Sequence, residues 1–311
     1  MRIVFIGTPH FSVPSLQKFQ ESSHELVGVI TAPDRKAGRG MKIQYSPVKD
    51  FAIQNDIPLL QPTNLKDPGF QEELRAWNAD IQVVIAFRML PESVWDMPPR
   101  GTINLHASLL PDYRGAAPIN WAIINGETET GLTTFQLVNE IDKGEILLQH
   151  KMMIGSDENA GSLHDRMMIE GADLVLKTLD SLESGELTAH PQDDSSARHA
   201  APKIFKEDCI IDWKKGAKEI HDLVRGLSPY PVARTFINDP DTEKDLVLKI
   251  FRSSVEAASH DVPPGVFDSD GKSYVRIACS DGWLHVHELQ LEGRRRMETE
   301  EFLRGYTFNK S

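Results

Sequence analysis

An asparagine and a histidine stand two residues apart in the stretch INLHASLLPDYRGAAP, inside a run that predicts a strand. Alternate side chains of a strand point to the same face, so Asn104 and His106 share one face. Burying both groups costs free energy unless each is hydrogen-bonded or used in chemistry. An Asn amide can donate to an oxyanion that develops at a carbonyl, and an imidazole exchanges protons near neutral pH. The pair is therefore either catalytic or a satisfied polar pair that closes a strand end.

A carboxylate further along the chain would complete such a site. Asp142 precedes Lys143 and Gly144, at a turn between two strand-like runs. From there a carboxylate would orient an imidazole and stabilise its protonated form. The competing interpretation is an Asx-turn, and spacing alone does not dismiss Glu140 or Glu145 as the carboxylate that acts.

The segment LLPDYRG after the strand has features of its own. Pro111 blocks continuation of the strand and frees nearby backbone groups from the ladder, so the segment can line a flat pocket. Arg114 is either an anion ligand or a structural clamp onto backbone carbonyls, and we favour the clamp.

The elements that position these residues alternate between strand-like and helix-like runs. Strands are predicted at residues 2–7, 25–31, 81–87 and 101–108, and helices from residue 12 and over residues 70–77. Alternation of this kind predicts βαβ units and a mostly parallel sheet covered by helices. Ligands bind such sheets at the carboxyl ends of strands, which is where LHASLLP lies. The runs at residues 131–138 and 144–154 predict a later antiparallel pair.

The second half of the chain predicts a different architecture. Residues 161–185 carry an apolar stripe typical of a long amphipathic helix, and a polar stretch rich in Pro, Ser and Ala follows. Residues 218–231 predict a short helix that ends at Gly226, and alternating runs punctuated by Gly and Asp follow, as in a small barrel. We therefore expect a catalytic domain at 1–185, a linker at 186–206 and a second domain at 207–311.

Composition narrows the class of protein. The 311 residues are 40% hydrophobic and 26% charged, which is typical of a soluble globular protein. No apolar run is long enough for a membrane helix or a signal peptide, and two cysteines suggest no disulfide framework, so we expect a cytoplasmic protein. Metal-binding motifs are absent from the sequence. The net charge of −12 argues against non-specific binding of nucleic acid by the whole molecule, although it allows a local basic patch.

A family resemblance then narrows the function. The run NLHASLLPDYRGAAPINWAIINGETETGLTTFQL, followed by IDKGEIL, closely resembles the catalytic domain of folate-dependent formyltransferases. The runs TAPDRKAGRGMKIQYSPVK and APKIFKEDCIIDW are similar to those of the family members that formylate methionyl-tRNA. The resemblance implies α/β architecture: a doubly wound, Rossmann-like formyltransferase domain, joined by a linker to an OB-like β-barrel domain that binds tRNA. One departure is AFRMLP at residues 86–91, which is one residue shorter than the family's usual segment beside the folate.

The same resemblance implies a reaction and roles for particular residues. The formyl group of 10-formyltetrahydrofolate would pass to the α-amino group of initiator methionyl-tRNA, for translation initiation, without a metal. Asn104, His106 and Asp142 would be catalytic. The folate would contact the S-L-L-P backbone, namely Ser108, Leu109, Leu110 and Pro111. We expect a monomer that works away from membranes.

A basic, glycine-containing loop is expected to meet the tRNA. On charge alone it would be a solvated loop, but the resemblance favours contact with the acceptor stem by Arg35, Lys36, Arg39 and Lys42. A lysine group between residues 203 and 218 and the run GRRRM are further candidates for phosphate contacts. Three alternatives remain: a formyltransferase acting on an amino-sugar nucleotide, a hydrolase that releases formate, and a non-catalytic RNA-binding protein.

Overall fold

The structure, a computed structural model, describes residues 1–37, 42–238 and 245–306. The chain divides into two compact units. Unit 1 comprises Met1–Gly115, Thr130–Met152 and His164–Ala200, and unit 2 comprises Ala116–Glu129, Met153–Leu163 and Ala201–Ser311. The predicted ends of the catalytic domain at residue 185 and of the linker at residue 206 are not tested by this division, so they stay predictions.

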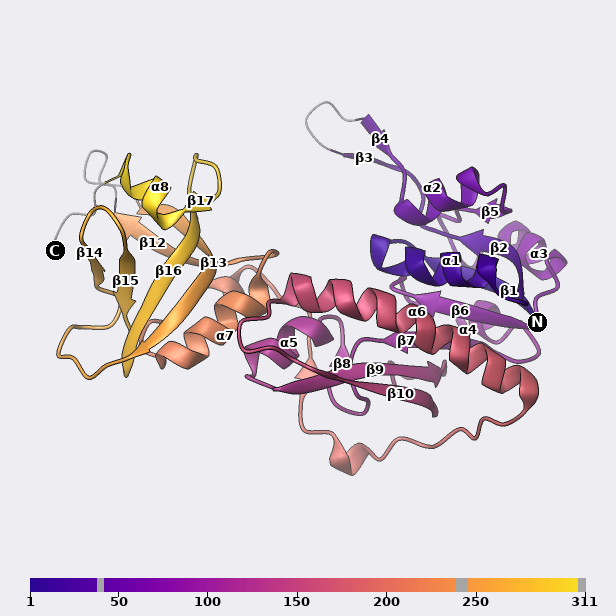
Figure 1. The fold of residues 1–311 in the computed structure, drawn as a ribbon. Coiled ribbons are helices and arrows are strands. Elements are labelled where there is room, and N and C mark those ends of the chain that lie inside the picture. The colour runs from indigo at the N-terminus through magenta and orange to yellow at the C-terminus, as the bar shows by residue number, and fades with distance from the viewer. Residues whose placement is uncertain (38–41, 239–244, 307–311) are drawn as a thin grey trace. The chain divides into compact units, whose positions relative to one another are not determined.

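A seven-stranded sheet forms the centre of unit 1 within the described residues, in the order β10-β9-β7-β6-β1-β2-β5 (Figure 1). Its strands are β1 (Arg2–Gly7), β2 (Glu25–Ile30), β5 (Leu59–Leu60), β6 (Ile81–Ile85), β7 (Thr102–His106), β9 (Glu129–Gln136) and β10 (Ile146–Met153). Neighbours from β5 to β7 pair in parallel, and β9 pairs with β7 in the antiparallel sense. The predicted doubly wound α/β architecture is confirmed.

Helices cover both faces of this sheet. Unit 1 contains α1 (Val13–Glu21), α2 (Pro47–Gln54), α3 (Pro68–Ala76), α4 (Glu92–Trp95), most of α6 (Ala160–Ser184) and the short 3₁₀ turns η1 (His10–Ser12) and η2 (Asp194–Ser196). On one face Val4 and Ile6 of β1 pack in a cluster with residues of α3 and α4. On the other, Phe5 packs edge-on against Phe19 of α1, with ring centroids 6.1 Å apart. Alternating burial along β1 therefore supplies both cores, as expected for a central parallel strand.

Strand β7 holds the predicted catalytic residues, and its own sequence fixes which way they point. Leu105 faces α6, because a side chain added at Gly171 of that helix would lie 2.7 Å from a Leu105 methyl carbon. Asn104 and His106 therefore lie on the opposite face of the sheet. The strand ends at His106, and the turn of Ser108 to Pro111 follows at the carboxyl edge of the sheet.

Unit 2 is built on an antiparallel sheet in the order β12-β13-β16-β15-β14, with β17 paired to β16. Its strands are β12 (Ala233–Asn238), β13 (Asp245–Ala257), β14 (Phe267–Ser269), β15 (Val275–Ala278), β16 (Gly282–Leu291) and β17 (Met297–Glu298). The long strands β13 and β16 change register at a bulge near Arg252 and give the curled, half-barrel sheet seen in Figure 1. This curled antiparallel sheet confirms the expected OB-like class of the second domain.

Helices and short strands complete the two units. Unit 2 also contains α5 (Pro118–Ile124), η3 (Glu207–Cys209), α7 (Ala217–Leu227) and α8 (Thr299–Leu303). The apolar side of α7 packs on the sheet through Ile220, Val224 and Leu227. The remaining short strands are β3 (Arg35–Ala37), β4 (Lys42–Gln44), β8 (Arg114–Gly115) and β11 (Ala200–Ala201).

Both cysteines are free and buried in unit 2. Burial raises the pKa of the Cys279 thiol to about 11, so this thiol stays protonated and packs as an apolar side chain. Among the helices of the described residues, none combines the length and the apolar character that crossing a membrane requires.

Candidate active site

The candidate site begins with two side chains at the end of β7. Asn104 lies beside Val84 of β6 and Phe135 of β9, while His106 lies beside Thr133 of β9. His106 is buried and Asn104 is half-buried. Because β7 lies inside the sheet, Asn104 is paired with a strand on each side, while His106 at the end of β7 is paired with β9.

A backbone carbonyl fixes the orientation of the His106 ring. Nε2 of His106 lies 2.8 Å from the carbonyl oxygen of Tyr113. A carbonyl oxygen only accepts, so Nε2 carries the proton and donates it. In the neutral ring Nδ1 then keeps its lone pair, and this atom faces Oδ2 of Asp142 at 3.8 Å.

The gap between His106 and Asp142 has a chemical meaning. A distance of 3.8 Å is longer than a hydrogen bond, and a neutral Nδ1 and a carboxylate oxygen are both acceptors. A group that brings a proton, such as an amine, can therefore lie to one side of the pair, within hydrogen-bonding distance of both atoms. Once Nδ1 of His106 takes that proton, the ring is a cation beside the carboxylate, which stabilises the new charge.

Asp142 is presented by a tight turn between β9 and β10. Its backbone lies in the left-handed region with φ 54°, and its Oδ2 accepts a hydrogen bond from the Gly115 N–H at 3.0 Å. Glu140 instead forms an exposed ion pair with Lys143 at 3.0 Å, and Glu145 is exposed. Of the three carboxylates near this turn, Asp142 is the one that the structure brings to His106.

Asn104 differs from the other two predicted catalytic residues. The structure gives its amide no hydrogen-bond partner among the residues that it describes, although the side chain is half-buried. The structure therefore does not show the satisfied polar pair that the sequence allowed, and the Asn104 amide remains accessible to solvent. Its donor hydrogens are available to a molecule that enters beside His106.

Most polar atoms of the S-L-L-P turn form hydrogen bonds within the protein. The Ser108 hydroxyl donates to the carbonyl of Asp112 at 2.6 Å. Thr133 Oγ1 donates to the carbonyl of Ser108 at 2.6 Å and accepts from the N–H of Leu110 at 3.1 Å. Leu109 and Pro111 remain partly exposed. The turn is thus rigidly held, and these two apolar residues are its accessible part.

The shortened segment after β6 is ordered through one arginine. Nη2 of Arg88 donates to the carbonyl of Pro62 at 2.5 Å, and its guanidinium lies 5.5 Å from the Phe87 ring centroid. The side chain of Met89 is 74% exposed.

The predicted tRNA-binding residues fall in a hairpin of unit 1 formed by β3 and β4. Arg35 is exposed on β3. Lys36 lies on β3 and Lys42 on β4, opposite Ile43 and Ala37. Arg39 lies outside the described residues.

The two basic groups of unit 2 differ in how far their charge is already neutralised. Arg295 forms an ion pair with Glu301, and Arg296 forms a bidentate ion pair with Glu288. In the lysine group, Lys206 and Lys214 are exposed and form no ion pair with the described residues. The other three lysines have neighbours: Lys215 with Glu219, Lys218 with Asp222, and Lys203 over the Phe205 ring.

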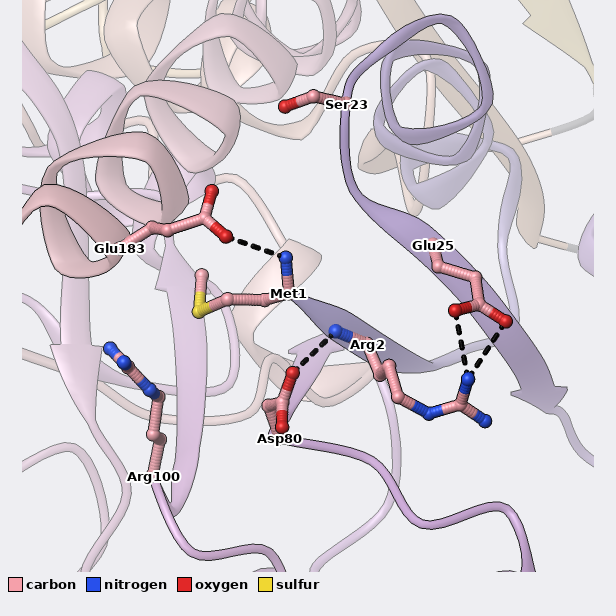
Figure 2. Close-up of a pocket in the computed structure, with 7 residues that line it drawn as sticks. All are labelled: Met1, Arg2, Ser23, Glu25, Asp80, Arg100 and Glu183. Carbon is pink, nitrogen blue, oxygen red and sulfur yellow. Dashed lines mark hydrogen bonds and ion pairs between the residues drawn. The ribbon is translucent and has the colours of Figure 1, made fainter.

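A separate polar pocket of 420 Å³ lies at the opposite, amino-terminal edge of the unit 1 sheet (Figure 2). Its charges neutralise one another: the amine of Met1 pairs with Glu183 at 2.8 Å, and Arg2 pairs with Glu25. The Arg2 N–H also donates to Asp80 at 2.7 Å. The pocket has no part in the site at the end of β7.

Two groups that hold the site were missed by sequence reasoning. The Tyr113 carbonyl orients His106, and the residue has φ 60°. Asp112 beside it is paired with Arg198. Burial raises the pKa of the Asp112 carboxyl, but hydrogen bonds from the Arg198 and His199 backbone and the Arg198 guanidinium outweigh burial and hold it below its usual range. No local pattern marks a backbone carbonyl as an orienting group, so only the fold identifies it.

The described part of the chain contains no group of three or more His, Cys, Asp or Glu side chains able to hold a metal ion. The polar groups at the end of β7 are an amide, an imidazole and one carboxylate. Each of them can form a hydrogen bond to an uncharged organic group.

Comparisons with known proteins identify the family to which the chain belongs. Residues 1–179 match the family model "Formyl transferase", and residues 203–307 match "Formyl transferase, C-terminal domain". The chain is 51% identical over 309 residues to a methionyl-tRNA formyltransferase of Bacteroides fragilis, with 98% of this chain and 95% of that protein covered. It is 50% identical over 309 residues to one of Flavobacterium johnsoniae, with 99% and 97% covered.

Solved structures share the fold at lower identity. An N-formyltransferase from Helicobacter canadensis, crystallised with folinic acid and dTDP-3-aminofucose, matches with a TM-score of 0.69 and 20% identity, covering 95% of this chain and 99% of that one. HypX from Aquifex aeolicus matches with a TM-score of 0.65 and 19% identity, covering 99% of this chain and 49% of that one. On the two family models and the full-length relatives, the chain belongs to the formyl transferase family.

Proposed function

We propose that the protein transfers the formyl group of 10-formyltetrahydrofolate to the α-amino group of initiator methionyl-tRNA, giving N-formylmethionyl-tRNA for translation initiation. The observation that carries this proposal is that His106 Nδ1 faces Asp142 Oδ2 at 3.8 Å. Two residues earlier on β7, the amide of Asn104 has no hydrogen-bond partner among the described residues. The full-length relatives at about half identity bear the name methionyl-tRNA formyltransferase, which supports the choice of acceptor.

The reaction begins when the neutral amine attacks the formyl carbon. The carbon becomes tetrahedral and its oxygen becomes an oxyanion. Asn104 donates a hydrogen bond to that oxyanion from its free amide, and such a donor is effective because it is held in place before the charge develops.

Proton transfer falls to His106 and Asp142. The attacking amine must lose a proton, and the folate nitrogen must gain one when its bond to the formyl carbon breaks. The amine lies beside the pair, within hydrogen-bonding distance of Nδ1 and Oδ2, so either atom receives the proton, directly or through water. The Tyr113 carbonyl keeps Nε2 protonated, which leaves Nδ1 as the ring's basic atom.

The folate contacts belong to the S-L-L-P turn in this proposal. Leu109 and Pro111 offer accessible apolar surface for the folate ring, while the buried Ser108 and Leu110 hold the turn. Their polar atoms are bonded within the protein, and a rigid turn of this kind loses little entropy when a ring binds.

Basic side chains on this otherwise acidic protein are proposed to contact the tRNA. Arg35, Lys36 and Lys42 on the hairpin of unit 1, together with Arg39, are proposed to follow the acceptor stem. The exposed Lys206 and Lys214 of unit 2 are proposed to contact phosphates. Because phosphate contacts release counterions, we expect the affinity for tRNA to fall steeply between about 50 and 200 mM salt. An affinity that does not change over this range would refute electrostatic docking.

The proposed substrates indicate the cellular compartment in which the protein acts. We propose that the protein acts as a monomer in the cytoplasm, where charged tRNA and reduced folate meet. Its two free, buried cysteines are compatible with a reducing compartment.

One assay separates the proposed function from its rivals. Purified protein receives 10-formyltetrahydrofolate labelled in the formyl group, together with methionyl-tRNA, an amino-sugar nucleotide or water alone. We expect the label on methionyl-tRNA. Label on the amino sugar, or its release as formate at the same rate without an acceptor, would contradict the proposal.

A further inference from the structure

The segment of residues 192–199 contacts the turn that presents Asp142. The Gln192 amide nitrogen donates to the carbonyl oxygens of Asp142, at 2.8 Å, and Gly144, at 2.7 Å. The Gln192 amide oxygen accepts two hydrogen bonds from Arg114, from Nε at 3.1 Å and from Nη2 at 2.6 Å. Both ends of one side-chain amide are thus committed to the Asp142 turn and its neighbour.

The Asp142 turn needs such external support. Its left-handed backbone is less favourable than the right-handed region even for Asp, so hydrogen bonds from outside the turn help to hold it. Gly144 is packed closely enough that an added Cβ would lie 1.5 Å from the carbonyl oxygen of Gln136. Arg114 supplies one more bond, from Nε to the Asp142 carbonyl at 3.1 Å. Together Gln192 and Arg114 tie down the backbone that aims the carboxylate at His106.

The other end of the same segment holds the group that orients His106. The Tyr113 N–H donates to the carbonyl of His199 at 2.8 Å, and the two rings stack with centroids 5.4 Å apart. Asp112 accepts hydrogen bonds from the Arg198 guanidinium at 3.0 and 2.8 Å. One segment therefore supports both the Tyr113 carbonyl and the Asp142 turn.

We propose that residues 192–199 form a positioning strap for the His106–Asp142 pair, with Gln192 as its central positioning residue. The proposal rests on the proposed function, since it assigns the strap to the same reaction. Gln192 bonds Asp142 through the backbone carbonyl and leaves the carboxylate free for the substrate. Its effect is to keep Oδ2 at the working distance from Nδ1.

The first test is a split between turnover and substrate binding. Gln192→Ala should lower kcat about 10- to 100-fold, because misplacing a reacting group by an ångström has effects of this size, while KM for both substrates stays unchanged. Ser196→Ala is the matched control in the same segment, since its hydroxyl bonds only the Asp193 carbonyl at 2.7 Å. An unchanged kcat in Gln192→Ala, or an equal loss in Ser196→Ala, would overturn the proposal.

The second test shows whether Gln192 acts through Asp142. In a double-mutant cycle, Gln192→Ala should add almost nothing to the loss already caused by Asp142→Asn, because the carboxylate it positions is gone. Losses that multiply independently would overturn the proposal. Gln192→Glu, which keeps an acceptor for Arg114 but loses the donors to Asp142 and Gly144, should behave like Gln192→Ala and provides a second variant if the alanine protein does not fold.

The third test needs no activity, so its result is independent of the proposed function. The Gly115 N–H donates to Asp142 Oδ2 at 3.0 Å, which protects it from hydrogen exchange. We expect Gln192→Ala to exchange this proton faster than both the wild-type protein and Ser196→Ala. Equal protection in all three proteins would overturn the strap, whereas an inactive wild-type protein would overturn only the proposed function.

Discussion

The end of β7 and the basic surface of unit 2 use their charged and polar groups in opposite ways. At the end of β7, His106, Asp142 and Ser108 each have an assigned partner, and Asn104 alone is left open. The basic groups of unit 2 that are proposed to bind tRNA, such as Lys206 and Lys214, are exposed. Catalysis needs groups held before the substrate arrives, whereas binding a polyanion needs charge that no neighbouring acid has already neutralised.

The largest effect should come from removing the carboxylate charge at the buried site. Asp142→Asn keeps the size of the side chain but cannot accept the proton of the amine, so kcat should fall about 10²- to 10⁴-fold. Steady-state kinetics with methionyl-tRNA measure this loss. Glu140→Gln, at the exposed pair with Lys143, is the control that should keep wild-type turnover. Equal turnover in the two variants would remove Asp142 from the chemistry.

The next effect should come from the open amide. Asn104→Ala should lower kcat about 10²- to 10³-fold, which corresponds to about 3–4 kcal/mol of barrier, because one oxyanion donor is lost. The dissociation constant for the folate should change little, since the amide acts on the transition state. Parallel measurements of kcat and folate binding check this, and a loss confined to binding would assign Asn104 to the ground state.

A smaller effect is expected from crowding the turn that carries Asp142. Gly144→Ala should destabilise the protein by about 1–3 kcal/mol, because its Cβ would overlap the Gln136 carbonyl and the turn must shift. Gly305→Ala is the control, since the nearest atom to its added Cβ is 3.7 Å away. Denaturant unfolding of both variants measures the difference. Equal stability would show that the turn is not closely packed.

The smallest effect should separate the two basic groups of unit 2. Lys206→Ala should reduce the slope of log affinity for tRNA against log salt by about 0.9, the value for one phosphate contact. Arg295→Ala should leave the slope unchanged, because its guanidinium is already paired with Glu301. Salt titrations of tRNA binding compare the two proteins. A larger change of slope in Arg295→Ala than in Lys206→Ala would contradict the expected difference between paired and unpaired basic residues.

Much of the fold was predictable because its signals are local. The apolar run at residues 2–7 coincides with β1, and the amphipathic stretch at residues 161–185 with α6 to within one residue at each end. The strand at residues 101–108 is shorter in the structure, because β7 ends at His106 where the S-L-L-P turn begins. Period and terminating residues carry this information in the sequence itself.

The chemistry of the site was partly predictable. Residue type and spacing placed Asn104 and His106 on one face, and the structure brings Asp142 to within 3.8 Å of His106. The interpretation of Arg114 as a clamp onto backbone carbonyls is confirmed by its bond to the Asp142 carbonyl. The proposed catalytic, folate and tRNA roles stay predictions until the variants are measured.

The supports of the site were not predictable. Gln192 reaches Asp142 across 50 residues of chain, and its own segment is polar and irregular, as in a linker. The carbonyl of Tyr113 acts through its backbone, which has the same chemistry at every residue. Contacts of this kind depend on the tertiary fold and leave no periodic or compositional signal.

The most direct measurement is a crystal structure of the protein with 5-formyltetrahydrofolate, an isomer of the donor that carries the formyl group on N5 instead of N10. The account predicts the formyl oxygen at about 2.7–3.1 Å from the Asn104 amide nitrogen, with the formyl carbon facing the gap between His106 and Asp142. A folate bound with its formyl group away from β7, and with Asn104 still unpaired, would contradict it.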